Sequence, residues 1–269
     1  MMNYFKGALL LLATTTFTVK SRKQCQCECD EERLSTVPSS VDDRYPTCRE
    51  EMMGNVTIGD LLTRELQADP NFSTAWLQAE RCNVTVANLT KLHVTALIVY
   101  THANRTFPGL FDIDTRSFGP EIIIYRRYFM YKSFHFLLTD ALQLLRARQE
   151  QEKIGCMLVY AKGTGWGKLQ GNVGDYVRTG NFMLASTQRY SALFDLIIWT
   201  CHGSILPSLS SHPCHSYSGL NVLVPPYELF KVAAVKKVPR RWVDGLTREY
   251  YLESIGTMSK LTCAFTSAM

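Results

Sequence analysis

The sequence predicts one α+β domain with a helical N-terminal part and a β-rich C-terminal half. Apolar residues recur at helical spacing as far as about residue 150, and from Cys156 onward they fall in short extended runs separated by Gly and Pro. Apolar residues make up 46% of the 269 residues and charged residues 20%, so the chain can bury a core and is not a disordered spacer. The net charge of +5 is spread without blocks of like charge, so we expect no nucleic-acid partner.

Residues 1–22 have the layout of a secretory signal peptide. Lys6 precedes an uncharged run from Gly7 to Val19, and polar residues 20–23 follow. A transmembrane anchor is the alternative, but the run falls below the roughly 20 apolar residues that a span needs. Only Ala-Phe-Thr-Ser-Ala-Met follows Cys263, which is too short for a lipid-anchor signal. We therefore expect secretion through the endoplasmic reticulum and a soluble extracellular product without a membrane anchor.

Five sequons for N-glycosylation support the same compartment. They are crowded into one stretch of the chain, at Asn55, Asn71, Asn83, Asn88 and Asn104. A Thr-rich composition is the alternative explanation and the weaker one. We therefore expect a glycoprotein.

Cysteines of a secreted protein are expected to form disulfides. Because the chain has nine, an odd number, one free thiol or one intermolecular bond should be left over. Residues 23–39 are predicted to be a Cys-rich extension, with Cys25, Cys27 and Cys29 at a spacing that lacks the paired CxxC pattern of zinc sites. The domain itself is predicted over residues 40–266. Cys201-His202 and His212–His215 lie around a Ser- and Pro-rich loop, where Cys201 is better used in a disulfide. No metal is expected.

Helices are predicted over most of the first half. Between Ile58 and Ala87, helical spacing is interrupted at Pro70, which separates two helices. His93 to Tyr100 is apolar and β-branched and fits either a buried strand or the start of a buried helix. Phe134 to Arg148 is the clearest helix, since its apolar residues form one stripe, and His135 is expected to be structural. The apolar positions are Phe134, Leu137, Leu138, Ala141, Leu142 and Leu145.

Short strands are predicted in the second half, at residues 157–160, 176–178, 181–185, 194–200, 222–224 and 229–235. The glycine-rich run Gly163–Lys168 lacks the spacing of a phosphate-binding loop, and a β-turn is expected there. No metalloprotease or serine-hydrolase motif is present. Composition and spacing alone therefore indicate a secreted α+β domain and no particular chemistry.

Several segments nevertheless resemble one family in consistent order. They are FHFLLTDALQLL at 134–145, VRTGNF at 177–182, IWTC at 198–201 and VLVPPYELFKV at 222–232, with Asp42–Tyr45 before Cys48 and Ala96-Leu97 before Tyr100-Thr101. Together they resemble the vertebrate ecto-ADP-ribosyltransferases, which are arginine-specific mono-ADP-ribosyltransferases. The resemblance covers residues 40–265 and implies the ADP-ribosyltransferase fold. It also implies two disulfides, Cys48–Cys263 and Cys156–Cys201, and leaves the pairing of Cys82 and Cys214 open.

The resemblance implies NAD or NADP as the substrate of a glycosyltransferase reaction. ADP-ribose would pass to the arginine of an extracellular protein, and nicotinamide would leave. The family uses an Arg to fix the dinucleotide, a Ser-x-Ser strand and a Glu-x-Glu pair. By the same resemblance, the NAD-binding positions would include Tyr160, Gly163, Ser186 and Tyr190.

The signature residues themselves are changed in this chain. The Arg position falls on Ala161, or on Lys162 if one residue is inserted, and the first Ser falls on Leu184, while Ser186 keeps the second. The two Glu positions fall on Gly219 and Asn221. No Glu lies between positions 153 and 227, so no shift of register restores the pair. Because one preorganised group is worth about 10²–10³ in rate, we expect a pseudoenzyme with little transfer activity.

Two alternatives stay open. The first is a residual enzyme, either an NAD hydrolase or a weak transferase that uses another carboxylate such as Asp195 or Glu228. Glu228 is more readily explained by a structural role after the double proline. The second is a secreted non-catalytic protein that presents the same fold to an unknown binding partner.

Overall fold

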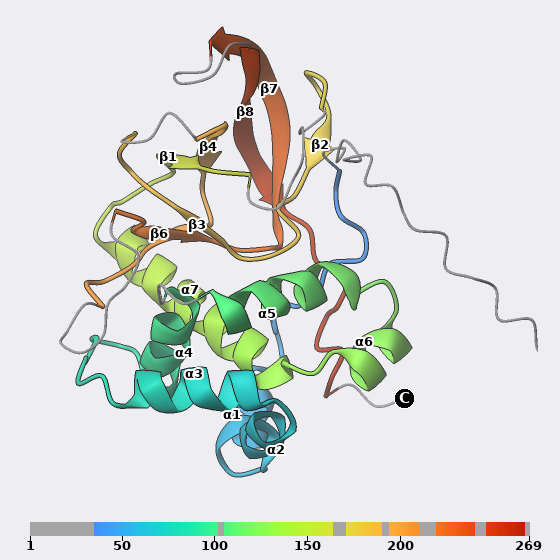
Figure 1. Cartoon of the computed structure of the whole chain (residues 1–269), viewed down its shortest axis with the longest axis vertical. Coiled ribbons are helices and arrows are strands. Elements are labelled where there is room, and N and C mark those ends of the chain that lie inside the picture. The colour runs from blue at the N-terminus through green and yellow to red at the C-terminus, as the bar shows by residue number, and fades with distance from the viewer. Residues whose placement is uncertain are drawn as a thin grey trace, which may run out of the picture. The chain divides into compact units, whose positions relative to one another are not determined.

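A computed structural model describes residues 35–101, 105–163, 171–189, 194–209, 219–239 and 246–266 (Figure 1). These residues belong to one unit, Glu31–Met269. The signal peptide expected at residues 1–22, Asn104, most of the Gly163–Lys168 run, Tyr190 and the His212–His215 group lie outside the described residues.

Seven helices are described in the first half of the chain. They are α1 (Arg49–Thr57), α2 (Leu61–Ala68), α3 (Pro70–Glu80), α4 (Lys91–Thr101), α5 (Thr106–Ser117), α6 (Ile122–Tyr128) and α7 (Lys132–Gln151). The break at Pro70 is confirmed, because Pro70 begins α3 and the Asp69 side chain accepts the backbone N–H of Asn71 at 2.7 Å. Residues 93–100 are helical, as part of α4, and all of them are buried. A helix that is buried on every side shows no amphipathic period, and this is why the sequence fits a strand equally well.

Helix α7 is the centre of the larger hydrophobic core. Its predicted apolar stripe is confirmed, with each of the six residues at most 5% exposed. His135 is structural, as expected. Its Nε2 lies 3.0 Å from the Val41 carbonyl and its Nδ1 lies 2.9 Å from the Tyr45 hydroxyl. Burial lowers the pKa of His135 to about 3, so the ring is neutral.

Two sheets are present in the described residues of the second half of the chain. The five-stranded sheet has the order β1-β4-β8-β7-β2, and the three-stranded sheet has the order β3-β6-β5. All neighbouring strands are antiparallel except β4 and β8, and β7 and β8 form the long hairpin seen in Figure 1. The strands are β1 (Met157–Ala161), β2 (Tyr176–Val177), β3 (Met183–Ala185), β4 (Leu196–Thr200), β5 (Ser204–Ile205), β6 (Val222–Val224), β7 (Glu228–Pro239) and β8 (Leu246–Thr257). Apolar side chains from both sheets make a second core.

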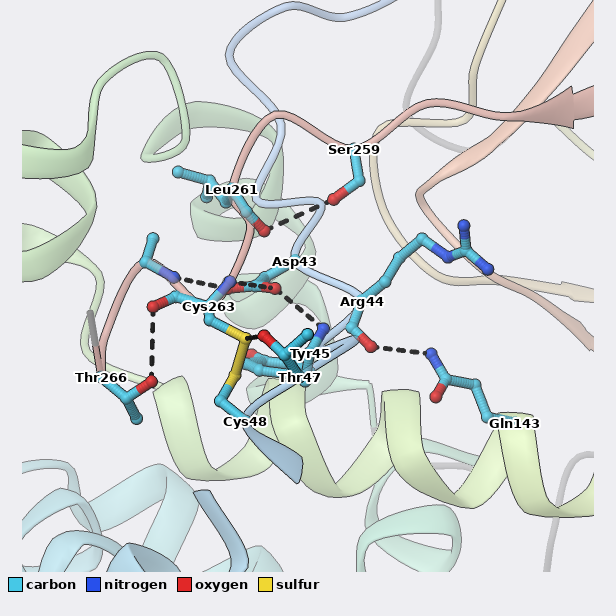
Figure 2. The surroundings of a disulfide bond; sticks show 11 residues. Asp43, Arg44, Tyr45, Thr47, Cys48, Gln143, Ser259, Leu261, Cys263 and Thr266 are labelled. Atoms are coloured by element: carbon cyan, nitrogen blue, oxygen red, sulfur yellow. Dashed lines mark hydrogen bonds between the residues drawn. A yellow bond between two sulfur atoms is a disulfide. The ribbon is translucent and has the colours of Figure 1, made fainter. Parts of the chain in front are cut away.

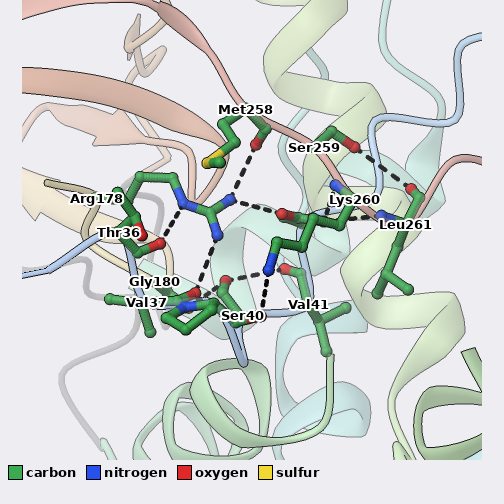
Figure 3. A network of polar contacts seen from close by, with 12 residues as sticks. Thr36, Val37, Ser40, Val41, Arg178, Gly180, Met258, Ser259, Lys260 and Leu261 are labelled. Carbon is green, nitrogen blue, oxygen red and sulfur yellow. Dashed lines mark hydrogen bonds and ion pairs between the residues drawn. The ribbon is translucent and has the colours of Figure 1, made fainter. Parts of the chain in front are cut away.

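A buried arginine ties both ends of the domain to the edge of the five-stranded sheet (Figure 3). Arg178 follows β2, and its Nη1 lies 2.6 Å from Asp42 Oδ2, with both side chains 0% exposed. The same guanidinium donates to the carbonyls of Thr36, Val37 and Met258. Residues 36 and 37, within the stretch predicted as an extension, therefore contact the domain directly.

Asp43 and a disulfide fix the C-terminal segment that follows β8 (Figure 2). The Asp43 carboxylate accepts the backbone N–H groups of Tyr45, Cys263 and Ala264 at 2.9–3.0 Å. Cys48 is bonded to Cys263 across 215 residues of sequence. The first and last parts of the domain are therefore held together covalently and by hydrogen bonds.

Glu65 of α2 is a buried carboxyl group whose side chain lies against the start of α7. It accepts the backbone N–H of Ser133 at 3.1 Å and the Ser133 hydroxyl. Ser133 is in the first turn of α7, so the carboxylate satisfies a helix N–H that has no partner within the helix. Burial nevertheless dominates and raises the pKa of Glu65 to about 7.

This raised pKa predicts a component of stability that falls with rising pH. In the unfolded chain Glu65 ionises near 4.5, whereas in the fold it keeps its proton until about pH 7. Between these values the unfolded state loses a proton that the folded state retains, so the stabilisation is full below pH 4.5 and decreases by on the order of 1 kcal/mol per pH unit up to pH 7. E65Q should lack this component in urea unfolding measured from pH 4.5 to 7. E51Q, an exposed control in α1, should keep the wild-type slope, and an E65Q slope equal to wild type would contradict the prediction.

Candidate functional site

The two sheets meet where β1 contacts the end of β3. The backbones of Tyr160 and Ser186 exchange two hydrogen bonds, at 2.8 and 2.9 Å, and Asn221 N–H donates to the Ala185 carbonyl at 3.0 Å. Three segments that are far apart in the sequence therefore converge here. They bring together Tyr160, Ala161, Leu184, Ser186 and Asn221, with Gly219 two residues before Asn221.

The polar side chains at this junction form hydrogen bonds with residues 187 and 188, which follow β3. Asn221 Oδ1 accepts the backbone N–H of Thr187 at 3.0 Å, and Asn221 Nδ2 donates to Thr187 Oγ1 at 3.0 Å. Ser186 is buried, and its Oγ accepts the backbone N–H of Gln188 at 3.0 Å. The neutral amide of Asn221 thus holds the residue before β6 against the segment that follows β3 by hydrogen bonds.

The remaining positions supply no charge. Ala161 is completely buried in the core between the sheets, and Leu184 is half-buried and packs against the helical core. Gly219 is exposed and has φ +84°, a left-handed conformation that glycine adopts readily and glutamate rarely does. A glutamate at position 219 would therefore be strained in this backbone.

Asp195 and Glu228, the two carboxylates considered above for a residual activity, both hold backbone groups. Asp195 Oδ1 accepts the N–H of Gly163 at 2.7 Å, and burial raises the pKa of Asp195. Glu228 is fully buried. Its Oε1 accepts the backbone N–H groups of Cys201 at 2.7 Å and His202 at 3.0 Å, and its Oε2 accepts the Thr200 hydroxyl at 2.6 Å. These bonds give Glu228 the structural role that we expected.

An ion pair beside the junction could not be predicted from the sequence. Arg189 follows β3, and its Nη2 contacts Oε1 of Glu249 on β8. The Arg189 guanidinium carbon lies 5.9 Å from the centre of the Tyr160 ring. Residues 189 and 249 lie 60 positions apart and carry no motif, so only the strand order reveals that they meet.

Both disulfides implied by the resemblance are confirmed. Cys48 is bonded to Cys263, and Cys156 is bonded to Cys201 across 45 residues. Cys82 also takes part in a disulfide. In the parts of the chain that the structure describes, no three His, Cys, Asp or Glu side chains are grouped so that they could hold a metal ion.

Comparison with known proteins identifies the family. A family model described as NAD:arginine ADP-ribosyltransferase matches residues 34–249. The chain belongs to the NAD:arginine ADP-ribosyltransferase family. It is 30% identical over 264 residues to the mouse GPI-linked NAD(P)(+)–arginine ADP-ribosyltransferase 1, covering 91% of this chain and 77% of that protein. Mouse ecto-ADP-ribosyltransferase 5 is 32% identical over 246 residues, covering 86% and 75%.

Solved structures confirm the fold. The crystal structure of the eukaryotic mono-ADP-ribosyltransferase ART2.2 superimposes with a TM-score of 0.64 at 25% identity, covering 87% of this chain and 99% of that one. A variant of ART2.2 in complex with NADH gives a TM-score of 0.65. None of the helices in the described ranges is long and apolar enough to cross a membrane.

Proposed function

We propose that this family member transfers little or no ADP-ribose. The observation that carries the proposal is that the four positions matched to the family signature hold Ala161, Leu184, Gly219 and Asn221. The reaction develops positive charge on the ribose, which a fixed carboxylate stabilises. Asn221 is uncharged, and both ends of its amide are bound to Thr187.

The two missing carboxylates should affect different steps. A carboxylate at the position of Asn221 would stabilise the positive charge that develops on the ribose. Both transfer and NAD hydrolysis require this stabilisation. The position of Gly219 would engage the acceptor guanidinium, which only transfer requires. The positive φ of Gly219 adds a backbone reason for the absence of a glutamate there.

NAD titration of the purified secreted protein, followed by calorimetry and by nicotinamide release, tests the proposal. We expect no nicotinamide release, with the mouse ADP-ribosyltransferase 1 as the positive control. Saturable binding without release would mean that the pocket for NAD or NADP is kept. Release at the rate of the positive control would overturn the proposal.

A variant provides the matched control. L184S/N221E restores the first Ser and the second Glu, leaves Gly219 unchanged and places no charge at the buried position of Ala161. We expect this variant to gain NAD hydrolysis over the wild-type chain but no transfer to an arginine acceptor. A folded double variant with no more hydrolysis than wild type would show that these two positions are not the ones that limit the reaction.

A non-catalytic binding role on the same fold is the second candidate. One row of exposed side chains crosses all five strands of the larger sheet in register, and three of its five members are large and apolar. The row is Leu158, Trp199, Glu253, Lys231 and Tyr176. Exposed apolar side chains gathered on one face are typical of protein-binding surfaces. The absence of NAD binding at millimolar concentration would favour this role.

We also infer that the protein is extracellular and glycosylated. The side chains of Asn71, Asn83 and Asn88 are exposed and Asn55 is half-buried, so these sequons lie at the surface. The disulfides fit an oxidising compartment. The names of its relatives include ecto- and GPI-linked enzymes. Mass spectrometry after glycosidase treatment of protein from the culture medium tests this assignment.

A further inference from the structure

A pocket of about 150 Å³ lies among three helices of the first half of the chain. It is bounded by α3, α4 and α5 and shares no residue with the junction of the two sheets. The buried part of its lining is apolar, since Ala75 is half-buried and Val99 and Phe107 are at most 2% exposed. A cavity of this volume is large enough to hold one six-membered ring.

The exposed part of the lining is polar. It consists of Asn71, Thr74 and Gln78 on α3 and Thr106 at the start of α5. None of the described residues that line the pocket is charged. A pyranose ring has the same division, with C–H groups on its faces and hydroxyl or amide groups on its edge. Because small-molecule pockets combine an apolar lining with a few polar groups, this pocket suits a neutral sugar.

One lining residue is itself an acceptor for glycosylation. Asn71 and Ser73 complete a sequon at the start of α3, and the Asn71 side chain is exposed. Three other lining residues follow Asn71 at i+3, i+4 and i+7, so all four share one face of the helix. A sugar joined to Asn71 therefore begins at the edge of the pocket. The other sequon asparagines that the structure describes do not line it.

The covalent bond makes occupation of the pocket favourable even if its affinity for a free sugar is weak. A group held by a short linker is present at an effective concentration of about millimolar or more. Contacts of only millimolar strength are then sufficient to keep the sugar bound for most of the time. A free monosaccharide would reach such a concentration only when added in large excess.

We propose that the first N-acetylglucosamine of a glycan on Asn71 occupies this pocket, where it contacts Val99 and Phe107 and joins α3 to α4 and α5. The inference rests on the glycosylation proposed above and not on the loss of transferase activity. One glycan would thus be part of the packed structure, whereas the glycans on Asn83 and Asn88 would extend into solvent.

Deglycosylation of the native secreted protein tests the proposal. Peptide N-glycosidase F cleaves the bond between asparagine and the first sugar and converts the asparagine to aspartate, so mass spectrometry of peptides gives the rate at each site. We expect Asn71 to react at least about tenfold more slowly than Asn83, because the enzyme reaches only the fraction of the sugar that has left the pocket. In heat-denatured protein the two rates should be equal.

A pocket-filling variant provides the matched control. A75L places a larger apolar side chain in the pocket and leaves the sequon intact. It should keep Asn71 glycosylated and raise its native cleavage rate to that of Asn83. L77Q changes an exposed residue of α3 outside the pocket and should keep the slow rate at Asn71.

Thermal unfolding gives a second readout. A group that is bound only in the folded state stabilises that state, so N71Q should lower the unfolding temperature. N83Q should not lower it. Trimming the wild-type glycans with an endoglycosidase to one sugar at each site should also leave the unfolding temperature unchanged, because only the first sugar lies in the pocket.

Several results would overturn the proposal. They are equal native cleavage rates at Asn71 and Asn83, an unchanged rate at Asn71 in A75L, and a faster rate at Asn71 in N104Q. N104Q removes the sequon that ends at Thr106, so the last result would mean that a glycan on Asn104 protects Asn71. If A75L is not secreted, an unchanged unfolding temperature in N71Q would reject the pocket as the site.

The same peptides separate this proposal from the one on which it rests. An unmodified Asn71 beside glycosylated Asn83 and Asn88 would reject the occupant of the pocket and leave the glycoprotein assignment in place. Absence of glycans at all of these sites would reject both.

Discussion

Replacing both Cys48 and Cys263 with serine should lower the free energy of unfolding by about 5 kcal/mol. The bond closes a loop of 215 residues, and in the chain-entropy description its main effect is to restrict the unfolded chain. The folded segment should stay in place, because Asp43 still accepts the N–H groups of residues 263 and 264. Urea unfolding of C48S/C263S measures the loss, and the larger unfolded ensemble should also raise the m-value.

The second disulfide is the matched comparison. Cys156–Cys201 closes a loop of 45 residues, so C156S/C201S should lose about 4 kcal/mol. The two variants should therefore rank by loop length. A loss below about 1 kcal/mol for C48S/C263S, or a clearly larger loss for the shorter loop, would show that the folded-state contacts rather than the chain entropy determine the effect.

The spacing of apolar residues predicted the elements that have one buried, apolar side and one exposed, polar side. The stripe of α7 and the break at Pro70 depend on neighbours three to four residues apart, which the sequence displays directly. α4 was ambiguous because all of its sides are buried. β8 was missed since Arg248, Glu249 and Glu253 interrupt its apolar residues, although β8 is a central strand held by β4 on one side and β7 on the other.

The candidate site was predicted only as a set of positions. Resemblance placed Ala161, Leu184 and Asn221 in the family pattern, and the structure brings their strands together. It could not show that Asn221 binds Thr187 or that Gly219 has a positive φ, because both depend on the backbone path between the strands. The partner of Glu249 was equally inaccessible, since no local rule links residues on β8 to the segment after β3.

Arg178→Met should be the most destabilising single substitution at the N-terminal junction, by about 3–5 kcal/mol. The substitution leaves the Asp42 carboxylate buried without its counter-ion. Removing one partner of a buried ion pair is strongly destabilising, whereas replacing both partners with apolar residues is often nearly neutral. It also leaves the carbonyls of Thr36, Val37 and Met258 without this donor. Urea unfolding measures the loss, and R178K, which keeps the charge but loses the planar fork, should fall between R178M and wild type.

The double variant separates the buried charge from the lost hydrogen bonds. In D42N/R178M, the introduced amide oxygen can still accept the N–H groups of Lys260 and Leu261, as Asp42 does at 2.8 and 3.0 Å, but no charge is stranded. D42N/R178M should therefore be more stable than R178M alone. If the two sites were independent, the effects of the two substitutions on the free energy of unfolding would simply add. R64Q breaks an exposed pair, in which both side chains are more than 60% exposed, and should change stability by at most about 0.5 kcal/mol. If R178M cost no more than R64Q, the buried pair would not be what holds residues 36–42 on the sheet.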